Sequence, residues 1–136
     1  MLAVLGVTLS SAASAQTFAK NKLECLSYGG EPMLECTVHL RNKDGTSLSG
    51  GKIVLSASMP SMPMAHSIRP VVAASIEKPG EYRGTLKLEM LGVWAIQADI
   101  SKPRRERLVQ SLRIEFCKPG KRCLATRAGE TNKSHR

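Results

Sequence analysis

The chain has 136 residues, which suits one domain and excludes large enzymes and multi-domain assemblies. Its 20 lysine and arginine side chains against 11 acidic ones give a net charge of +9, and the 42% hydrophobic content excludes a wholly disordered chain. Only 4% of the residues are aromatic and no apolar run approaches the ~20 residues that span a bilayer, so neither nucleic-acid stacking nor a transmembrane helix is expected.

The amino terminus predicts a secretory signal peptide of residues 1–15. Residues 2–9 form an apolar run, and the small residues that follow end in Ala13, Ser14 and Ala15, which is the pattern of a signal-peptidase site. The usual basic segment before the apolar run is missing, and the alternative is a buried first element of the domain. With a signal peptide, the mature chain begins near Gln16 and the protein is periplasmic or secreted.

The cysteines support export into an oxidising compartment. Four cysteines allow three pairings, and the short spacings favour the disulfides Cys25–Cys36 and Cys117–Cys123. Each disulfide would stabilise the fold by about 2–4 kcal/mol. The alternative is a thiol metal site or a redox pair, although Cys-x-x-Cys spacing and neighbouring histidines are absent.

Alternation of apolar and polar residues predicts strands along most of the chain, and no segment sustains a helical period. In chain order, the predicted strands are 34–40, 52–58, 71–76, 82–90, 93–100 and 107–116. About seven short strands, each with one apolar face to cover, predict an all-β fold, an antiparallel β-sandwich of residues 16–123. Residues 124–136 are polar and are expected to form a flexible basic tail.

The same alternation predicts which side chains face the core, because successive strand residues point to opposite faces of a sheet. The predicted inward residues are Leu34, Cys36, Val38, Leu40, Ile53, Leu55, Ala57, Tyr82, Gly84, Leu86, Leu88, Met90, Trp94, Ile96, Ala98, Ile100, Leu108, Leu112, Ile114 and Phe116.

Metal-binding side chains gather in the segment Met-Pro-Ser-Met-Pro-Met-Ala-His, residues 59–66. Its two prolines favour extended backbone, in which Met62, Met64 and His66 project to the same side. Thioethers are soft, neutral ligands that suit Cu(I), and an imidazole can complete the set. The alternative is that these methionines only fill the end of the sandwich. The candidate Cu(I) ligands are Met59, Met62, Met64 and His66, with Met90 and Trp94 in support.

Nothing in the chain indicates catalysis, and we expect a binding protein rather than an enzyme. No Gly-x-Ser-x-Gly, His-Glu-x-x-His or phosphate-binding glycine motif is present. His39 lies on the polar face of a predicted strand and His135 lies in the tail, so neither is expected to bind a metal.

The positive charge is concentrated late in the chain. Residues 102–136 contain 11 basic and 3 acidic side chains, whereas residues 1–101 contain 9 and 8. A solvated basic edge is the simple explanation. The functional alternative is a non-metal interaction module that docks through its basic C-terminal edge onto an acidic partner or anionic lipid headgroups.

Several motifs occur around the methionine segment. It is preceded by an Asp44-Gly45 turn, and it is followed by Pro-Gly-Glu-Tyr at 79–82 and by Leu-x-Leu-x-Met-x-Gly-x-Trp at 86–94. Over residues 33–101 this arrangement resembles the YtkA-like and FixH-like periplasmic domains. The resemblance implies an exported immunoglobulin-like sandwich associated with copper handling or with oxidase assembly. We therefore expect a copper carrier or an accessory of efflux or oxidase assembly, with an efflux or oxidase-assembly protein as its partner. The cysteine pairs and the basic tail have no counterpart in that resemblance, and the transmembrane anchor usual in FixH-like proteins is not seen.

Overall fold

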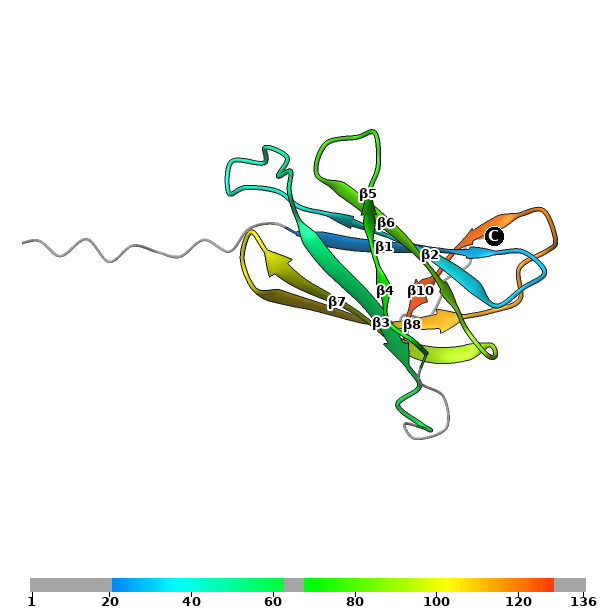
Figure 1. Ribbon diagram of the computed structural model, residues 1–136. Helices are drawn as coiled ribbons and strands as arrows, with labels where there is room; N and C mark the ends of the chain where they lie inside the picture. Colours follow the sequence, from blue (N-terminus) through cyan, green and yellow to red (C-terminus); the bar gives the residue numbers. More distant parts are fainter. Residues whose placement is uncertain (1–20, 63–67, 129–136) are drawn as a thin grey trace, which may run out of the picture.

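The computed structural model describes residues 21–62 and 68–128, which contain strands and no helix (Figure 1). The predicted signal peptide therefore lies outside the described residues. No helix in the described part of the chain is long and apolar enough to cross a membrane. The strands are β1 (Lys22–Tyr28), β2 (Met33–His39), β3 (Lys52–Ser58), β4 (Val71–Val72), β5 (Ala74–Ser75), β6 (Glu81–Lys87), β7 (Gly92–Lys102), β8 (Glu106–Ile114), β9 (Arg122–Leu124) and β10 (Thr126–Arg127).

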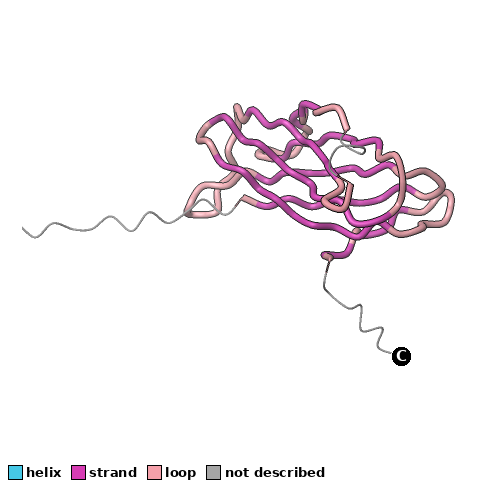
Figure 2. Tube along the Cα trace, turned by 90° about the horizontal axis from the view of Figure 1, so that it is seen from below, coloured by secondary structure: helices cyan, strands magenta, loops and turns pink. Residues whose placement is uncertain are grey.

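The strands form two antiparallel sheets of five strands each, which confirms the predicted all-β sandwich. One sheet has the order β5-β6-β2-β1-β9 and the other has the order β10-β8-β7-β3-β4. Figures 1 and 2 show the long strands of the two sheets as two layers. The sandwich has more strands than the sequence predicts because β1 is not among the predicted strands, 71–76 divides into β4 and β5, and β9 and β10 are only two or three residues long.

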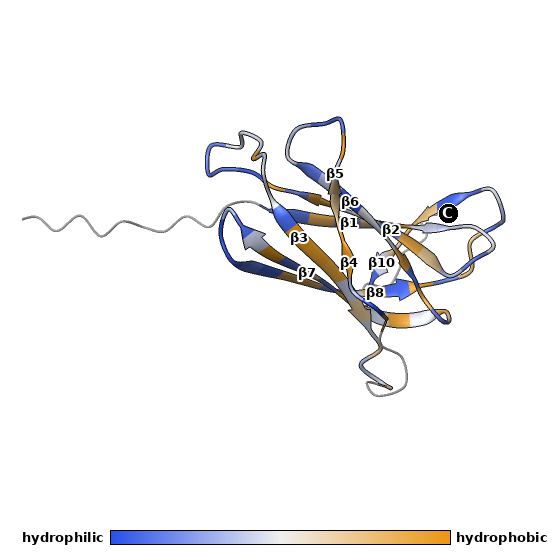
Figure 3. Cartoon of the chain, viewed as in Figure 1, coloured by the Kyte–Doolittle hydropathy of each residue, from blue (hydrophilic) through white to orange (hydrophobic). Residues whose placement is uncertain are grey.

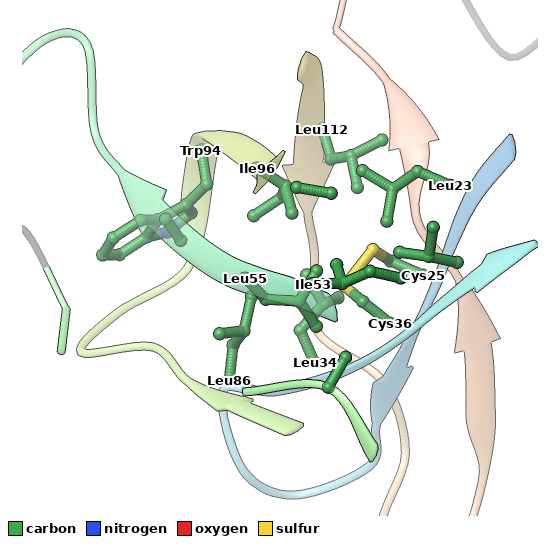
Figure 4. Close-up of a cluster of buried hydrophobic side chains, with 14 of the residues drawn as sticks. Leu23, Cys25, Leu34, Cys36, Ile53, Leu55, Leu86, Trp94, Ile96 and Leu112 are labelled. Carbon is green, nitrogen blue, oxygen red and sulfur yellow. A yellow bond between two sulfur atoms is a disulfide. The ribbon is translucent and has the colours of Figure 1, made fainter. Parts of the chain in front are cut away.

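Alternate residues of the long strands fill the space between the sheets. Ile53 and Leu55 of β3, Leu86 of β6, and Trp94 and Ile96 of β7 are all 0% exposed, as predicted from the alternation. In Figure 4, Trp94 lies at one end of this cluster, and Leu23, Cys25 and Cys36 lie at the other. Burial of each large apolar side chain stabilises the fold by roughly 1.5–3 kcal/mol relative to exposure.

The chain changes sheet at two places that the sequence does not reveal. The predicted strand 71–76 is two strands, because β4 pairs with β3 and β5 pairs with β6 in the other sheet. Between them, Ala73 is buried and its N–H donates to the Ile53 carbonyl at 3.0 Å. At the opposite edges, β9 pairs with β1 and β10 pairs with β8. Short strands thus occupy all four sheet edges, which limits edge-to-edge pairing with other chains.

Three expectations from the sequence are corrected. The strand β1 is absent from the predicted strands, yet it pairs with β2 over six residue pairs. Met90 and Phe116 continue the predicted inward alternation, but β6 ends at Lys87 and β8 at Ile114, so these side chains are 39% and 71% exposed. Part of the expected flexible tail is strand, since Leu124 closes β9 and residues 126–127 form β10.

Both predicted disulfides are present. Cys25 and Cys36 are bonded and lie directly opposite each other in the β1–β2 pair, and both side chains belong to the core. Cys117 and Cys123 are bonded and close the connection between β8 and β9. No cysteine is free, so the alternative of thiol metal ligands is wrong.

The connection between β8 and β9 is held against the turn between β1 and β2. The N–H groups of Gly29 and Gly30 donate to the carbonyls of Lys121 and Cys117 at 2.8 and 3.1 Å. A Cβ atom at Gly29 would lie 1.7 Å from the Lys118 carbonyl oxygen, so glycine is required by this close approach.

Candidate metal-binding loop

The methionine loop leaves the sandwich at the end of β3 and returns to the same place. The Met62 N–H donates to the Met59 carbonyl at 3.1 Å, which closes a turn around Pro60. After the loop, the Ile68 N–H donates to the Ala57 carbonyl at 3.2 Å. The loop is therefore anchored at both ends by backbone hydrogen bonds near the last residues of β3.

The described loop residues differ in their access to solvent. Met59 is 4% exposed and belongs to the hydrophobic core, whereas Met62 is 39% exposed. Met64 and His66 lie outside the described residues. Of the four predicted ligands, the structure thus places one at the buried base of the loop and one at its surface.

The base of the loop packs against the start of β7. The Met59 Cε atom would lie 2.9 Å from a Cβ atom at Gly92, so the absence of a side chain at Gly92 makes room for the thioether. Gly92 also has a φ of +135°, which favours glycine over other residues. Met59 is therefore fitted against the start of β7.

The two predicted supporting residues lie close together, Met90 on the connection between β6 and β7 and Trp94 on β7, but in different surroundings. Trp94 is 0% exposed and fills the core. Its Nε1–H donates to the Met90 carbonyl at 3.0 Å and fixes the turn before β7. The Met90 side chain lines a groove of about 180 Å³, together with Leu91, Phe116 and residues of the β1–β2 turn. Neither Met59 nor Met62 lines this groove.

No group of three histidine, cysteine, aspartate or glutamate side chains that could hold a metal ion occurs among residues 21–62 and 68–128. Methionine thioethers are a separate class of donor, with a preference for soft ions such as Cu(I). The sequence places three of them within the loop, at 59, 62 and 64.

His39 lies between two carboxylates, which its place on the polar face of a predicted strand does not reveal. Its side chain is 16% exposed, with Nδ1 at 3.1 Å from Glu81 Oε1 and Nε2 at 3.4 Å from Glu24 Oε2. The distance from Nε2 to Glu24 Oε2 is within the range of an ion pair, but Nε2 makes no hydrogen bond. The carboxylates come from β6 and β1 on either side of β2, so only the strand register brings them to His39. A hydrogen bond from Lys22, together with the positive charge of its ammonium group, lowers the pKa of Glu24.

A second cluster on the same sheet surrounds Glu35, which is 9% exposed. Its carboxylate accepts a hydrogen bond from the Tyr28 hydroxyl and lies 3.3 Å from Arg83 Nε and 3.8 Å from Arg122 Nη1. The Arg122 guanidinium also lies 5.1 Å from the centre of the Tyr28 ring. The hydrogen bond to Glu35 raises the pKa of Tyr28. These contacts offset the free-energy cost of burying the Glu35 carboxylate. No local sequence pattern predicts them.

A pH-dependent contribution to stability is expected from Asp99 on β7. Its carboxylate accepts hydrogen bonds from Gln97 Nε2 and from Arg107 Nε, both at 2.7 Å, and these lower its pKa below the ordinary value of 3.8. A depressed pKa contributes stability above the ordinary value, and this contribution disappears as the pH falls through the folded-state pKa. Asp99→Asn should therefore lower the free energy of unfolding at neutral pH.

Urea unfolding of both proteins across the acid range tests this prediction. The difference in the free energy of unfolding between the wild type and Asp99→Asn should be constant above about pH 5 and should vanish at the acid end of the range. A difference that stays constant throughout would show that the charge of Asp99 is not responsible.

Comparison with known proteins gives one match. The model of the YtkA-like family matches residues 27–99, a region that runs from the end of β1 to β7 and contains the methionine loop. No curated protein and no solved structure shows significant similarity to the chain.

Proposed function

The chain belongs to the YtkA-like family, and on that premise we propose that it is an exported Cu(I)-binding protein. It acts as a copper carrier, without catalytic activity of its own, for an efflux or oxidase-assembly partner. The donors are the thioethers of Met62 and Met64 and the imidazole of His66, with Met59 as the donor at the buried base of the loop. The observation that carries the proposal is the Met59–Met62 turn, which is anchored on the sandwich and leaves the Met62 side chain open to solvent.

Two features of the loop support a soft-metal site. Its thioether donors are uncharged, so their binding of Cu(I) does not compete with protons at mildly acidic pH. The described ends of the loop also make backbone hydrogen bonds beside the end of β3, from Met62 to Met59 and from Ile68 to Ala57. These bonds reduce the order that the two ends would lose on binding.

The two disulfides support the exported location. Disulfides persist in oxidising compartments such as the periplasm or the extracellular space. All four thiols are consumed in these bonds, so the soft donors left for a copper ion are thioethers.

The decisive experiment is a Cu(I) titration of the oxidised, exported protein against a calibrated Cu(I) chelator. Loss of a residue that only orients a metal ligand already costs about 10–100-fold in affinity, so Met62→Leu/Met64→Leu should cost more than about 100-fold. Leucine has a similar volume, so the fold should be retained. Met33→Leu is the matched control, because Met33 lies at the start of β2 and outside the loop.

The single variant Met59→Leu tests the buried donor. Because Met59 is 4% exposed, we expect a smaller loss of affinity than with Met62→Leu. Unchanged Cu(I) affinity in the Met62→Leu/Met64→Leu protein would contradict the proposed function and return the loop to a packing role.

A further inference from the structure

Four exposed cations gather at the end of the sandwich opposite the methionine loop. They are Lys52, Lys102, Arg104 and Arg105, which we term the cationic end. Lys52 opens β3 and Lys102 closes β7, whereas Met59 and Gly92 lie at the other ends of these two paired strands. Seven residues of extended β3 separate the two ends by roughly 20 Å. The hairpin between β7 and β8 that carries Arg104 and Arg105 projects at this end in Figure 1.

A β-bulge brings two of these cations face to face. Lys52 pairs with Lys102, but the next residue, Ile53, pairs with Ile100, so Ser101 is the extra residue. Without the bulge, Lys52 would lie opposite a serine. Like charges directly opposite each other destabilise a sheet. The fold therefore contains an unfavourable arrangement that a bound anionic surface would relieve.

The neighbouring carboxylates are engaged elsewhere. Asp99 binds Gln97 and Arg107, and Glu106 accepts a hydrogen bond from Asn21 at 2.6 Å. The Asp44 carboxylate accepts hydrogen bonds from the backbone N–H and the hydroxyl of Thr46. In the part of the chain that the structure describes, none of the four cations forms an ion pair.

The surroundings of these cations favour a charged lipid surface over a protein. The segments at the cationic end are 41–52 and 101–107. Among the described residues, no exposed large hydrophobic side chain lies in either segment. Figure 3 likewise shows the β7–β8 hairpin as hydrophilic. Stable protein interfaces depend on buried aromatic or aliphatic anchors at their centre, whereas lipid headgroups can be bound by lysine and arginine alone.

We propose that the cationic end docks the sandwich onto an anionic phospholipid membrane. Docking in this orientation presents the methionine loop away from the lipid. The proposal does not depend on copper binding, because the two surfaces lie at opposite ends of β3 and β7.

Cosedimentation of the exported protein with vesicles tests the proposal. The vesicles contain phosphatidylglycerol with phosphatidylcholine, or phosphatidylcholine alone. Each cation near an anionic surface strengthens binding several-fold, so Lys102→Gln/Arg104→Gln/Arg105→Gln should weaken binding to the anionic vesicles by about tenfold or more. Wild-type binding should fall steeply as salt is added. The protein with Met62→Leu/Met64→Leu should bind these vesicles as the wild type does.

The matched control removes the same charge from another surface. Lys118→Gln/Lys121→Gln/Arg127→Gln also loses three positive charges, from exposed residues near the opposite end, and should change binding less than twofold. Circular dichroism checks that both triple variants are folded. Equal losses in the two triple variants would overturn the proposal in favour of net charge alone.

Two further outcomes would also overturn it. Equal binding to phosphatidylcholine alone would assign the attachment to apolar contacts. Binding to polyglutamate but not to anionic vesicles would assign the cationic end to an acidic protein.

Discussion

Replacing Trp94 with alanine is expected to lower the free energy of unfolding by about 3–5 kcal/mol, the range for truncating a buried aromatic side chain. Trp94 is 0% exposed and is among the largest fully buried side chains in the core. The variant leaves a cavity between the sheets and removes the donor to the Met90 carbonyl. Urea unfolding, followed by circular dichroism because the single tryptophan is lost, measures the effect.

The variant Trp94→Phe separates the two contributions. Phenylalanine keeps most of the apolar volume but cannot donate to Met90, so its cost should be clearly smaller than that of alanine. If both variants lost the same stability, the hydrogen bond rather than the packing would be the main contribution. A loss below about 1 kcal/mol for alanine would be inconsistent with a residue packed in the core.

Removing the core disulfide is expected to have the second large effect. Cross-linking residues 11 apart in the sequence restricts the unfolded chain, and Cys25→Ala/Cys36→Ala should lower the free energy of unfolding by about 2–4 kcal/mol. The side chains are also 4% and 0% exposed, so the loss of core contacts adds to that cost. Chemical unfolding of the variant and the wild type gives the difference.

The second disulfide provides the comparison. Cys117 and Cys123 are 6 apart, and the chain-entropy model makes the contributions of the two loops differ by only about 0.5 kcal/mol. We therefore expect Cys117→Ala/Cys123→Ala to cost less, because Cys123 lies outside the core cluster. A larger cost for this pair would show that its contacts with the β1–β2 turn outweigh burial at Cys25 and Cys36.

The two proposals assign different tasks to the two ends of one strand pair. At one end of β3 and β7, Met59 packs beside Gly92 beneath the methionine loop. At the other end, Lys52 and Lys102 oppose each other. A membrane-docked carrier would hold its copper site toward a partner rather than toward the lipid. Since the variants at each end are independent, one proposal can fail without the other.

Much of the core could be predicted because alternation is a local property of an extended chain. Leu34, Ile53, Leu55 and Ile96 are buried as their phase predicts. The same reasoning fails for Met90 and Phe116, where the strands end before the alternation does. Where a strand ends depends on whether its neighbour still pairs with it. The alternation of residues along one strand carries no information about that pairing.

The candidate site could be predicted only in part. The cluster of methionines is visible in the sequence, but the burial of Met59 depends on Gly92, which lies 33 residues later. The carboxylates beside His39 were missed for a similar reason, because Glu24 and Glu81 belong to the two neighbouring strands. Contacts of this kind follow from strand register rather than from spacing along the chain.

The sequence by itself determined the alternation within the long strands other than β1 and the methionine-rich segment, and it favoured the two disulfide pairings, because each depends on residues that are close together in the chain. Only the tertiary structure decided that 71–76 divides between the two sheets, and that a bulge at Ser101 brings Lys102 opposite Lys52. A shift of one residue in pairing changes which side chains meet, and distant segments acquire their register only when the two sheets pack.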